Sequence, residues 1–215
     1  MSGPSSQYFS RTPAVDSAEQ EIQLSLADLE LQFTTDRGVF SQSRIDAGTR
    51  LLLQEAPHPT PSMINVCDLG CGYGPIAVSL ARRSPATSVW AVDLNERAVA
   101  LTAKNGVAND CPDIHAVVVD SDGSAIDGTP EDVAALPTTQ FDGLWSNPSI
   151  RIGKPAMHHM LTVWLDRLTP SGMAWLVVQR HLGADSLADW MTAQGWATTR
   201  VCSRAGYRLL EVKAR

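Results

Sequence analysis

A carboxylate and a glycine-rich turn lie together at residues 68–75, which read Asp-Leu-Gly-Cys-Gly-Tyr-Gly-Pro. Glycines let the backbone pass close to a ligand, and the free N–H groups of a following helix attract an anion. A second acid, Asp93, ends the next apolar segment. Its two oxygens can accept hydrogen bonds from both hydroxyls of a ribose. The leading Asp68 suits a ligand with an ammonium group. Together these residues predict a site for a ligand that has a ribose and an ammonium group.

Other ligands use similar loops. A dinucleotide fingerprint reads G-x-G-x-x-G, but here Gly70, Gly72 and Gly74 recur at every second residue and Pro75 stands where the last glycine belongs. A phosphate loop requires a Gly-Lys pair, and none follows. A tight turn without a ligand is the third interpretation, which the ordered combination of acid, glycines and second acid disfavours.

A second constellation is the Asn147-Pro148 pair, which follows the apolar segment Phe141–Ser146. The pair resembles the NPP-aromatic motif of methyltransferases that act on planar amino groups. The lone pair of such an amine is delocalised into its ring, so the resemblance implies acceptors that hold its two N–H bonds. The Asn147 side-chain oxygen and a backbone carbonyl fixed by proline can supply them. The remaining catalysis is positioning and preorganised polarity. Asn-Pro is also ordinary turn punctuation, so the pair indicates chemistry only in the context of a ligand loop.

Short apolar strands alternating with amphipathic helices must position these residues. We expect strands over 63–69, 89–94, 114–119, 141–146, 173–178, 197–202 and 207–212, and helices over 75–83, 96–108, 155–168 and 186–194. This alternation is typical of an α/β fold with a buried parallel sheet. Ligands bind such sheets at the carboxyl ends of the strands, which is where the glycine loop and Asn147 fall.

The N-terminal part differs from this pattern. Residues 1–20 are rich in Ser and Pro and predict a flexible tail, whereas 21–35 alternate apolar and polar residues and predict a β-hairpin. Ser43 is expected to cap the next helix. The polar stretch 120–139 suggests no regular element. We therefore expect one domain over 21–215.

Composition limits the class of protein. The 215 residues are 44% hydrophobic, and no apolar run approaches the about 20 residues of a membrane span. The N-terminus shows no apolar signal segment, so we expect a cytoplasmic protein with no membrane partner. The four cysteines lack paired spacing, which predicts reduced thiols and no metal site.

Charge is distributed unevenly along the chain. The formal net charge of −6 argues against a non-specific nucleic-acid coat, and we expect no DNA partner. Residues 1–142 carry 19 acidic and 8 basic side chains, whereas residues 143–215 carry 4 and 9. The basic end is either a surface for a polyanion or an ordinary solvated surface.

The Asp68 loop resembles motif I of class I S-adenosylmethionine (SAM) methyltransferases. The resemblance implies their Rossmann-like fold, a seven-stranded, mostly parallel sheet with helices on both faces and an antiparallel C-terminal hairpin. The implied SAM contacts are Asp68, Gly70, Cys71, Gly72, Asp93, Leu94, Asn95, Asp120 and Asn147. Asp68 and its loop would hold the amino-acid end, Asp93 the ribose, and Asp120, or alternatively Asp122, the adenine amine.

The string Ser-Asn-Pro-Ser-Ile-Arg-Ile-Gly-Lys at 146–154 resembles the SNPPIRxGK motif of RsmC-type proteins, which methylate the N2 amine of guanine in 16S rRNA. Residues 35–41 and 46–49 also resemble this family, as do 177–183 and 206–208, so the resemblance covers about 8–213. It implies that Phe40 covers the cofactor and that Asp46 and Thr49 lie near its methionine end. It makes Asn147 and Pro148 catalytic, and it implies substrate contacts from Ser149, Ile150, Arg151 and Lys154.

The expected activity is therefore methyl transfer from SAM to a guanine N2 amine in small-subunit rRNA or a ribosomal assembly intermediate, leaving S-adenosylhomocysteine. Two departures keep alternatives open, because Ser149 replaces the second proline of the NPP-aromatic motif and Ile150 replaces its aromatic residue. Losing an aromatic face removes about 1–3 kcal/mol of base stacking. A protein glutamine, a small-molecule acceptor, or SAM binding without catalysis would also fit.

Overall fold

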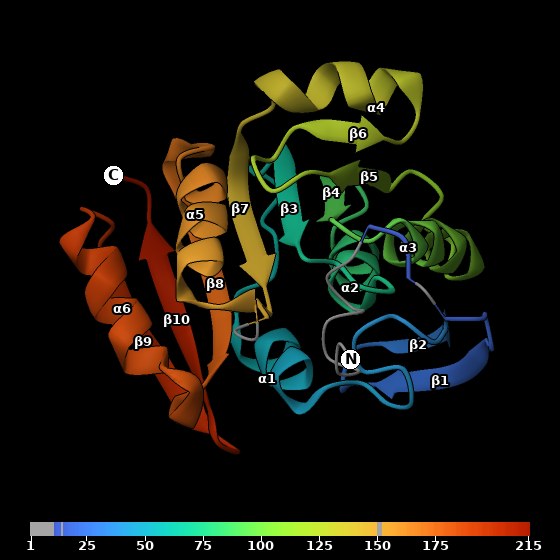
Figure 1. Cartoon of the computed structure of the whole chain (residues 1–215), viewed down its shortest axis with the longest axis horizontal. Helices are drawn as coiled ribbons and strands as arrows, with labels where there is room; N and C mark the ends of the chain where they lie inside the picture. Colours follow the sequence, from blue (N-terminus) through green and yellow to red (C-terminus); the bar gives the residue numbers. More distant parts are fainter. Residues whose placement is uncertain (1–10, 14, 150–151) are drawn as a thin grey trace.

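A computed structural model describes residues 11–13, 15–149 and 152–215 of the chain (Figure 1). The elements are β1 (Gln20–Ser25), β2 (Glu30–Thr35), α1 (Ala47–Glu55), β3 (Asn65–Leu69), α2 (Pro75–Arg83), β4 (Ser88–Asp93), α3 (Glu96–Ala108), β5 (His115–Val119), β6 (Ala125–Asp127), α4 (Pro130–Ala135), β7 (Phe141–Ser146), α5 (Lys154–Leu165), β8 (Leu168–Gln179), α6 (Ala184–Ala193), β9 (Thr198–Arg204) and β10 (Tyr207–Lys213). Short 3-10 helices span Leu136–Thr138 and Arg180–Leu182.

The main sheet has the strand order β6-β5-β4-β3-β7-β8-β10-β9. The strands from β5 to β8 pair in parallel, and β10 joins β8 and β9 antiparallel. The chain order reverses between β3 and β7, which is where an open α/β sheet forms its ligand crevice. The predicted α/β fold with an antiparallel C-terminal hairpin is confirmed.

Helices cover both faces of the sheet, as the sequence predicts (Figure 1). Helices α1, α2 and α3 pack on one face, and α4, α5 and α6 pack on the other. The core is accordingly divided into two clusters. Trp145 and Trp175 stack in one of them, with their ring centroids 4.6 Å apart, and Trp164 and Leu161 are buried in the other. Strands buried on both faces explain their continuous apolar sequences.

The sheet has eight strands rather than the expected seven, because residues 120–139 contain regular structure. The three residues of β6 pair antiparallel with β5, and α4 follows with Thr129 as its N-cap. Asp120 and Gly123 make the turn between β5 and β6. A three-residue, mostly exposed edge strand has too little apolar periodicity to be read from sequence.

The N-terminal hairpin forms as predicted, with β1 and β2 paired in a separate two-stranded sheet. Residues 1–20 are expected to form a flexible tail, but those of them that the structure describes make contacts with the rest of the protein. Arg11 pairs with Glu96, and the backbone of Val15 and Ala18 bonds to Arg97 and Asp36. These residues are therefore fastened beside α3. Polar composition suggested a tail because such contacts between distant segments leave no local pattern.

The cap of α1 also differs from the expectation. Asp46, not Ser43, is the N-cap, and its side chain accepts hydrogen bonds from the N–H groups of Gly48 and Thr49. Asp and Ser are comparable caps, so composition alone does not choose between them. The three-residue shift places a carboxylate beside the functional site described next.

Candidate functional site

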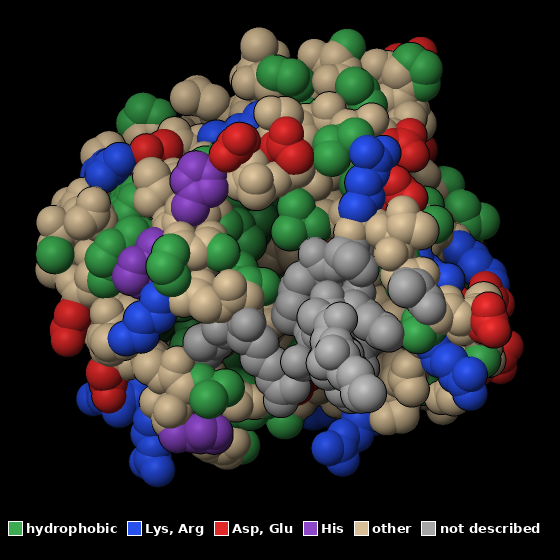
Figure 2. All heavy atoms as spheres, viewed as in Figure 1, with side chains coloured by type: hydrophobic (Ala, Val, Ile, Leu, Met, Phe, Trp, Pro, Cys, Tyr) green, Lys and Arg blue, Asp and Glu red, His purple; other side chains and the backbone are tan. Residues whose placement is uncertain are grey.

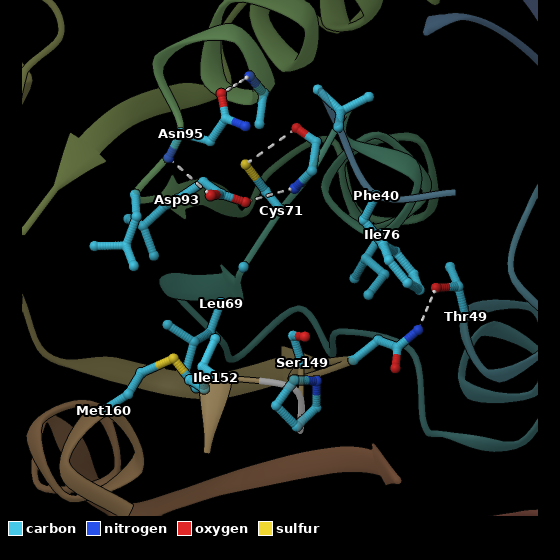
Figure 3. A pocket seen from close by; sticks show the side chains of 18 of the residues that line it. Phe40, Thr49, Leu69, Cys71, Ile76, Asp93, Asn95, Ser149, Ile152 and Met160 are labelled. Carbon is cyan, nitrogen blue, oxygen red and sulfur yellow. Dashed lines mark hydrogen bonds between the residues drawn. The ribbon is translucent and has the colours of Figure 1, made fainter. Parts of the chain in front are cut away.

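A cavity of about 600 Å³ opens at the carboxyl ends of β3, β4, β5 and β7 (Figure 3). This volume lies within the range of small-molecule pockets. Asp93, Cys71 and Asn95 lie on one side of it, and Ser149, Ile152 and Met160 lie across from them. The residues of the glycine loop and of the Asn-Pro segment therefore share one cavity, although more than 70 residues separate them in the chain.

The glycine loop presents bare backbone to this cavity. Gly70 and Gly72 have φ angles of 76° and 59°, which L side chains rarely adopt, and a Cβ built on either meets nothing within 4 Å. The loop is tied to β4, because Gly70 N and Cys71 N donate to Val92 O and Gly72 N donates to the Asp93 carboxylate. The space in front of these glycines is thus open for a ligand to approach the backbone.

Asp93 stands at the end of β4 on the cavity wall. Its Oδ2 accepts from Gly72 N and its Oδ1 from Asn95 N, each at 3.0 Å. Burial raises the pKa of Asp93, and these N–H donors oppose the rise. Each oxygen keeps acceptor capacity for a ligand hydroxyl. Leu94 and Asn95 also line the cavity, and the Asn95 side-chain oxygen caps α3.

Asp68 lies beneath the loop rather than on the cavity wall. It is completely buried, and its Oδ2 accepts from Ala77 N in the first turn of α2. Its Oδ1 has no hydrogen-bond partner within the described residues. Burial raises the pKa of Asp68 to about 8, and the charge of Asp93 adds to the rise. In this structure Asp68 supports the loop from behind, and its predicted contact with an ammonium group stays a prediction.

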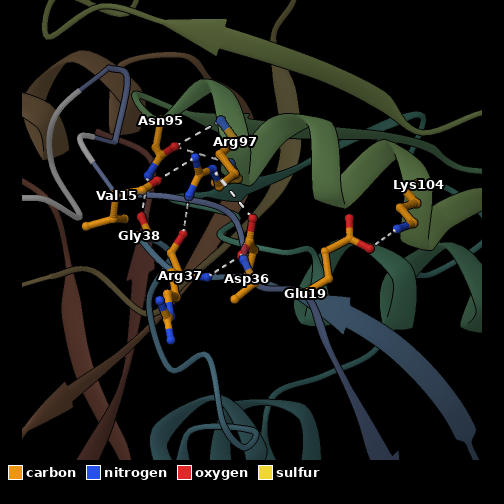
Figure 4. Close-up of polar contacts among 10 residues, drawn as sticks. Val15, Glu19, Asp36, Arg37, Gly38, Asn95, Arg97 and Lys104 are labelled. Atoms are coloured by element: carbon orange, nitrogen blue, oxygen red, sulfur yellow. Dashed lines mark hydrogen bonds and ion pairs between the residues drawn. The ribbon is translucent and has the colours of Figure 1, made fainter.

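The segment Thr35–Ser41 forms the entrance and is held by the start of α3 (Figure 4). Asn95 Nδ2 donates to Gly38 O at 2.8 Å, and Arg97 donates to Arg37 O at 2.7 Å while facing the Asp36 carboxylate. Val39, Phe40 and Ser41 then reach the cavity. These contacts explain how a loop far from the glycine turn in sequence becomes part of the same site.

Two sequence expectations concern single side chains at the rim. Phe40 lines the cavity and is 48% exposed, so it is not a core aromatic. Of the alternatives Asp120 and Asp122, Asp120 lines the cavity, and its carboxylate accepts from the N–H groups of Asp122 and Ser124. Asp122 instead pairs with His159.

Asn147 is oriented by two groups at the start of α1. Its Nδ2 donates to Asp46 Oδ2 at 2.9 Å and to Thr49 Oγ1 at 3.0 Å. An ionised carboxylate can only accept, so the Asn147 amide must turn its NH2 toward Asp46. Its Oδ1 has no hydrogen-bond partner within the described residues. An acceptor oxygen is therefore presented beside Pro148 and Ser149, which also line the cavity.

The wall across from the glycine loop is apolar. It comprises Ile152, Ala156, Met160, Trp164 and Leu182. Lys154 begins α5 and is exposed outside the cavity lining. Ile150 and Arg151, which the sequence also assigned to substrate binding, lie outside the described residues. A flat apolar group entering from this side would meet aliphatic surface.

Gln179 and Tyr207 also line the cavity and were given no role from sequence. They are direct cross-strand partners in β8 and β10, and Gln179 Nε2 donates to Tyr207 OH at 3.0 Å. From sequence, the segments 177–183 and 206–208 show only a resemblance to RsmC-type proteins. No local pattern shows that a strand end and a hairpin will close a pocket formed by residues 40–150.

Within the part of the chain that the structure describes, no group of three or more His, Cys, Asp or Glu side chains could hold a metal ion. In the same residues, no helix has the length and apolarity needed to cross a membrane.

The family model "Methyltransferase small domain" matches residues 30–211. The chain therefore belongs to this methyltransferase family. The resemblance to class I methyltransferases of the RsmC type is confirmed, since proteins of that type are among its relatives.

The relatives differ in length and in what is known of them. An uncharacterized protein, YbxB of Bacillus subtilis (strain 168), is 31% identical and aligns over 97% of this chain and 98% of its own length. Ribosomal RNA small subunit methyltransferase C of Shewanella baltica (strain OS195) is also 31% identical, over 75% of this chain. Only 43% of that protein is covered, so the chain spans about half the length of such relatives or less.

Among solved structures, the 16S rRNA N2 G1207 methyltransferase RsmC of T. thermophilus, in complex with AdoMet and guanosine, aligns with a TM-score of 0.72. The alignment covers 94% of this chain and 52% of that protein at 24% identity, which supports the fold. TrmN from Thermus thermophilus aligns with a TM-score of 0.57 over 78% of this chain.

Membership in this class makes the chain a SAM-dependent methyltransferase. The cavity fits the cofactor by its own chemistry. The open space at Gly70 and Gly72 admits a polar chain against the backbone, Asp93 offers acceptors for two hydroxyls, and Val119 and Leu94 supply apolar surface for a base. Asp120 stands beside that apolar surface with a carboxylate.

Proposed function

We propose that this protein transfers a methyl group from SAM to the exocyclic N2 amine of a guanine in small-subunit rRNA. The observation that carries the proposal is the Asn147 amide, whose nitrogen is held by Asp46 and Thr49 while its oxygen lacks a partner within the described residues. It lies in the same cavity as the glycine loop. The named activity of the RsmC relatives supports the choice of acceptor.

SAM, when bound, supplies an electrophilic methyl group. We propose that Gly70, Gly72 and Asp93 hold it, and that Leu94, Asn95 and Asp120 surround its adenosine. In this proposal Phe40, which lines the cavity, covers the bound cofactor. The proposed contribution of Asp68 is indirect, because it ties the loop to the first turn of α2.

Asn147 Oδ1 and the Pro148 carbonyl then accept the two N–H bonds of the acceptor amine. Holding both hydrogens in fixed directions leaves the nitrogen lone pair aimed at the methyl group. No strong base is required in this scheme, since preorganised acceptors stabilise the positive charge that develops on the nitrogen. The apolar wall at Ile152 and Met160 contacts the ring of the base. The implied contacts of Ser149, Ile150, Arg151 and Lys154 with the substrate are part of this proposal.

The partner in this proposal is the small ribosomal subunit or a precursor of it, in the cytoplasm. The target base must be unpaired or flipped out to reach a cavity of this kind. A protein glutamine amide has the same planar NH2 group, so it is the alternative acceptor.

The test is methyl transfer from labelled SAM to four acceptors prepared from cells that lack the gene: small subunits, large subunits, deproteinised 16S rRNA, and ribosomal proteins. We expect label in small subunits, recovered as N2-methylguanosine after digestion. Label in a protein fraction instead would support a glutamine acceptor. Intact SAM binding with no label in any fraction would contradict an enzymatic role toward ribosomes.

A further inference from the structure

Asp46 lies at the centre of a hydrogen-bond network that joins three distant segments. Its Oδ2 accepts from Gly48 N at 2.8 Å, Thr49 N at 3.2 Å and Asn147 Nδ2 at 2.9 Å. Its Oδ1 accepts from Tyr207 OH at 3.3 Å. The carboxylate thus has donors on both oxygens, and it contacts α1, the end of β7 and the start of β10.

The direction of each hydrogen bond in this network follows from Asp46. Tyr207 gives its single proton to the carboxylate, so its oxygen is left to accept, and Gln179 must turn Nε2 toward it at 3.0 Å. Burial raises the pKa of Tyr207, which keeps the phenol protonated for this role. Consequently Gln179 Oε1, like Asn147 Oδ1, has no hydrogen-bond partner within the described residues.

Steric detail supports a close Tyr207–Asp46 contact. A Cβ built on Gly48 would lie 2.6 Å from Tyr207 Cε1, a separation that real Cβ atoms do not show. The glycine at position 48 therefore gives the Tyr207 ring the space it occupies. Gln179 and Tyr207 are cross-strand partners, and this pairing fixes the position of Gln179 at the other end of the hydrogen-bond network.

We propose that Asp46 is a positioning residue that presets two amide oxygens, and that Gln179 Oε1 accepts the N1–H of the target guanine while Asn147 Oδ1 accepts its N2 amine. This inference rests on the proposed function for the identity of the acceptor. Guanine presents N1–H and the N2 amine side by side on one edge, which matches two acceptors and no donor. A base whose N1 lacks hydrogen would face the Gln179 oxygen with a lone pair.

The discriminating probes are guanosine and 2-aminopurine riboside, which keeps the 2-amine but has no N1–H. Both are measured as competitors of methyl transfer to small subunits. We expect the wild-type protein to prefer guanosine by about tenfold or more, because a buried acceptor left unpaired is costly. In Gln179→Leu the preference should fall below about threefold. Gln54→Leu is the matched control, since Gln54 is exposed on α1 outside the cavity, and it should keep the wild-type preference.

The positioning role is tested separately on the side-chain amide resonances of Asn147 and Gln179. Tyr207→Phe should speed hydrogen exchange of the Gln179 NH2 and leave the Asn147 NH2 unchanged. Asp46→Asn should disturb both, since asparagine keeps the N-cap but has only one oxygen to accept with.

The outcomes separate the two proposals. If the wild-type protein forms no N2-methylguanosine, the proposed function fails, and the amide resonances still decide whether Asp46 positions both side chains. If it forms N2-methylguanosine but binds the two nucleosides equally or not at all, or if Gln179→Leu keeps the preference, the role of Gln179 is overturned. If hydrogen exchange of the Gln179 NH2 is unchanged in Tyr207→Phe, the proposal that Asp46 orients Gln179 through Tyr207 is overturned.

Discussion

At the residue scale, Asn147 is held through its nitrogen and presents its oxygen to the cavity. We predict that Asn147→Ala lowers the rate of methyl transfer on the order of 10²–10³-fold, because one preorganised acceptor is removed. The dissociation constant of SAM should change by less than about threefold. Single-turnover rates and calorimetric titration with SAM measure the two quantities.

A matched control for this variant is Asn65→Ala. Asn65 begins β3, at the opposite end of that strand from the cavity, and its side-chain oxygen accepts a long hydrogen bond from Trp90 Nε1 at 3.4 Å. We expect this variant to keep the wild-type rate. A rate for Asn147→Ala within about threefold of wild type would contradict the assignment of the acceptor oxygen.

Asp68 should make the stability of the cofactor-free protein depend on pH. Its pKa rises from an ordinary 3.8 in the unfolded chain to about 8 in the fold, so the folded state binds the extra proton between these values. The free energy of unfolding should therefore fall as pH rises from about 4 to about 8, on the order of 2–5 kcal/mol.

Urea unfolding from about pH 5 to about pH 9 measures this dependence. Asp68→Asn should flatten the curve and be the more stable protein at the alkaline end, because it has no charge to bury. If wild type and Asp68→Asn lose stability in parallel, the buried carboxyl is not its cause.

Single residues were predictable where a local motif carried the chemistry. The glycine loop, Asp93 and Asn147 could be placed in one site because parallel strands end at the same edge of the sheet. Gln179 and Tyr207 could not, since Gln179 donates to Tyr207 and Tyr207 in turn donates to Asp46, which is 161 residues before it in the chain.

At the scale of elements, α3 attaches the N-terminal hairpin by two asparagine side chains that imitate a neighbouring strand. Asn105 accepts from Thr34 N and donates to Thr34 O, and Asn109 does the same with Gln32. Asn105 is completely buried and also donates to Tyr73 O beside the glycine loop. The hairpin and the loop are thereby joined to one helix.

We predict that Asn105→Ala lowers the free energy of unfolding by about 2–3 kcal/mol, because it leaves backbone groups of the half-buried Thr34 and the buried Tyr73 without their partner. Lys104→Ala is the control on the same helix. Its salt bridge to Glu19 is about half exposed, so a change below about 1 kcal/mol is expected. Equal stability losses in the two variants, measured by urea unfolding, would refute the strand-like role of Asn105.

Long periodic elements followed from the sequence, and α2 and α3 have the bounds that it predicts. The features that the sequence predicts wrongly or misses are short or depend on tertiary contacts. The N-cap of α1 is Asp46 and not the expected Ser43. Strand β6 is not predicted, because its three residues carry no periodicity.

At the scale of the whole molecule, three of the nine basic residues in 143–215 pair with acidic side chains of the protein itself. Arg204 pairs with Glu55, Arg208 with Asp185 and Arg215 with Asp166. Figure 2 shows the face with the cavity opening near its centre, where hydrophobic side chains gather, and acidic and basic groups alternate around it. These three arginines are therefore not free to neutralise phosphates.

We predict a weak salt dependence of binding to small subunits. With about two or three phosphate contacts, the slope of log affinity against log salt should be about −2. The Michaelis constant for subunits between about 50 and 200 mM KCl measures it. A slope steeper than about −5 would mean that the arginines leave their partners to grip RNA.

The fold class followed from the alternation of strands and helices, because that pattern admits few arrangements. The distribution of net charge did not predict the surface. A count of arginines in the chain does not show that three of them form ion pairs with Glu55, Asp166 and Asp185.

Nucleoside analysis of rRNA from living cells tests whether this protein methylates a guanine N2 amine. Small-subunit rRNA from cells without the gene, and from the same cells given back either the wild-type gene or Asn147→Ala, is digested and quantified by mass spectrometry. We predict that N2-methylguanosine falls by about one residue per 16S molecule without the gene, and that only the wild-type gene restores it. Equal N2-methylguanosine in all three rRNAs would contradict it.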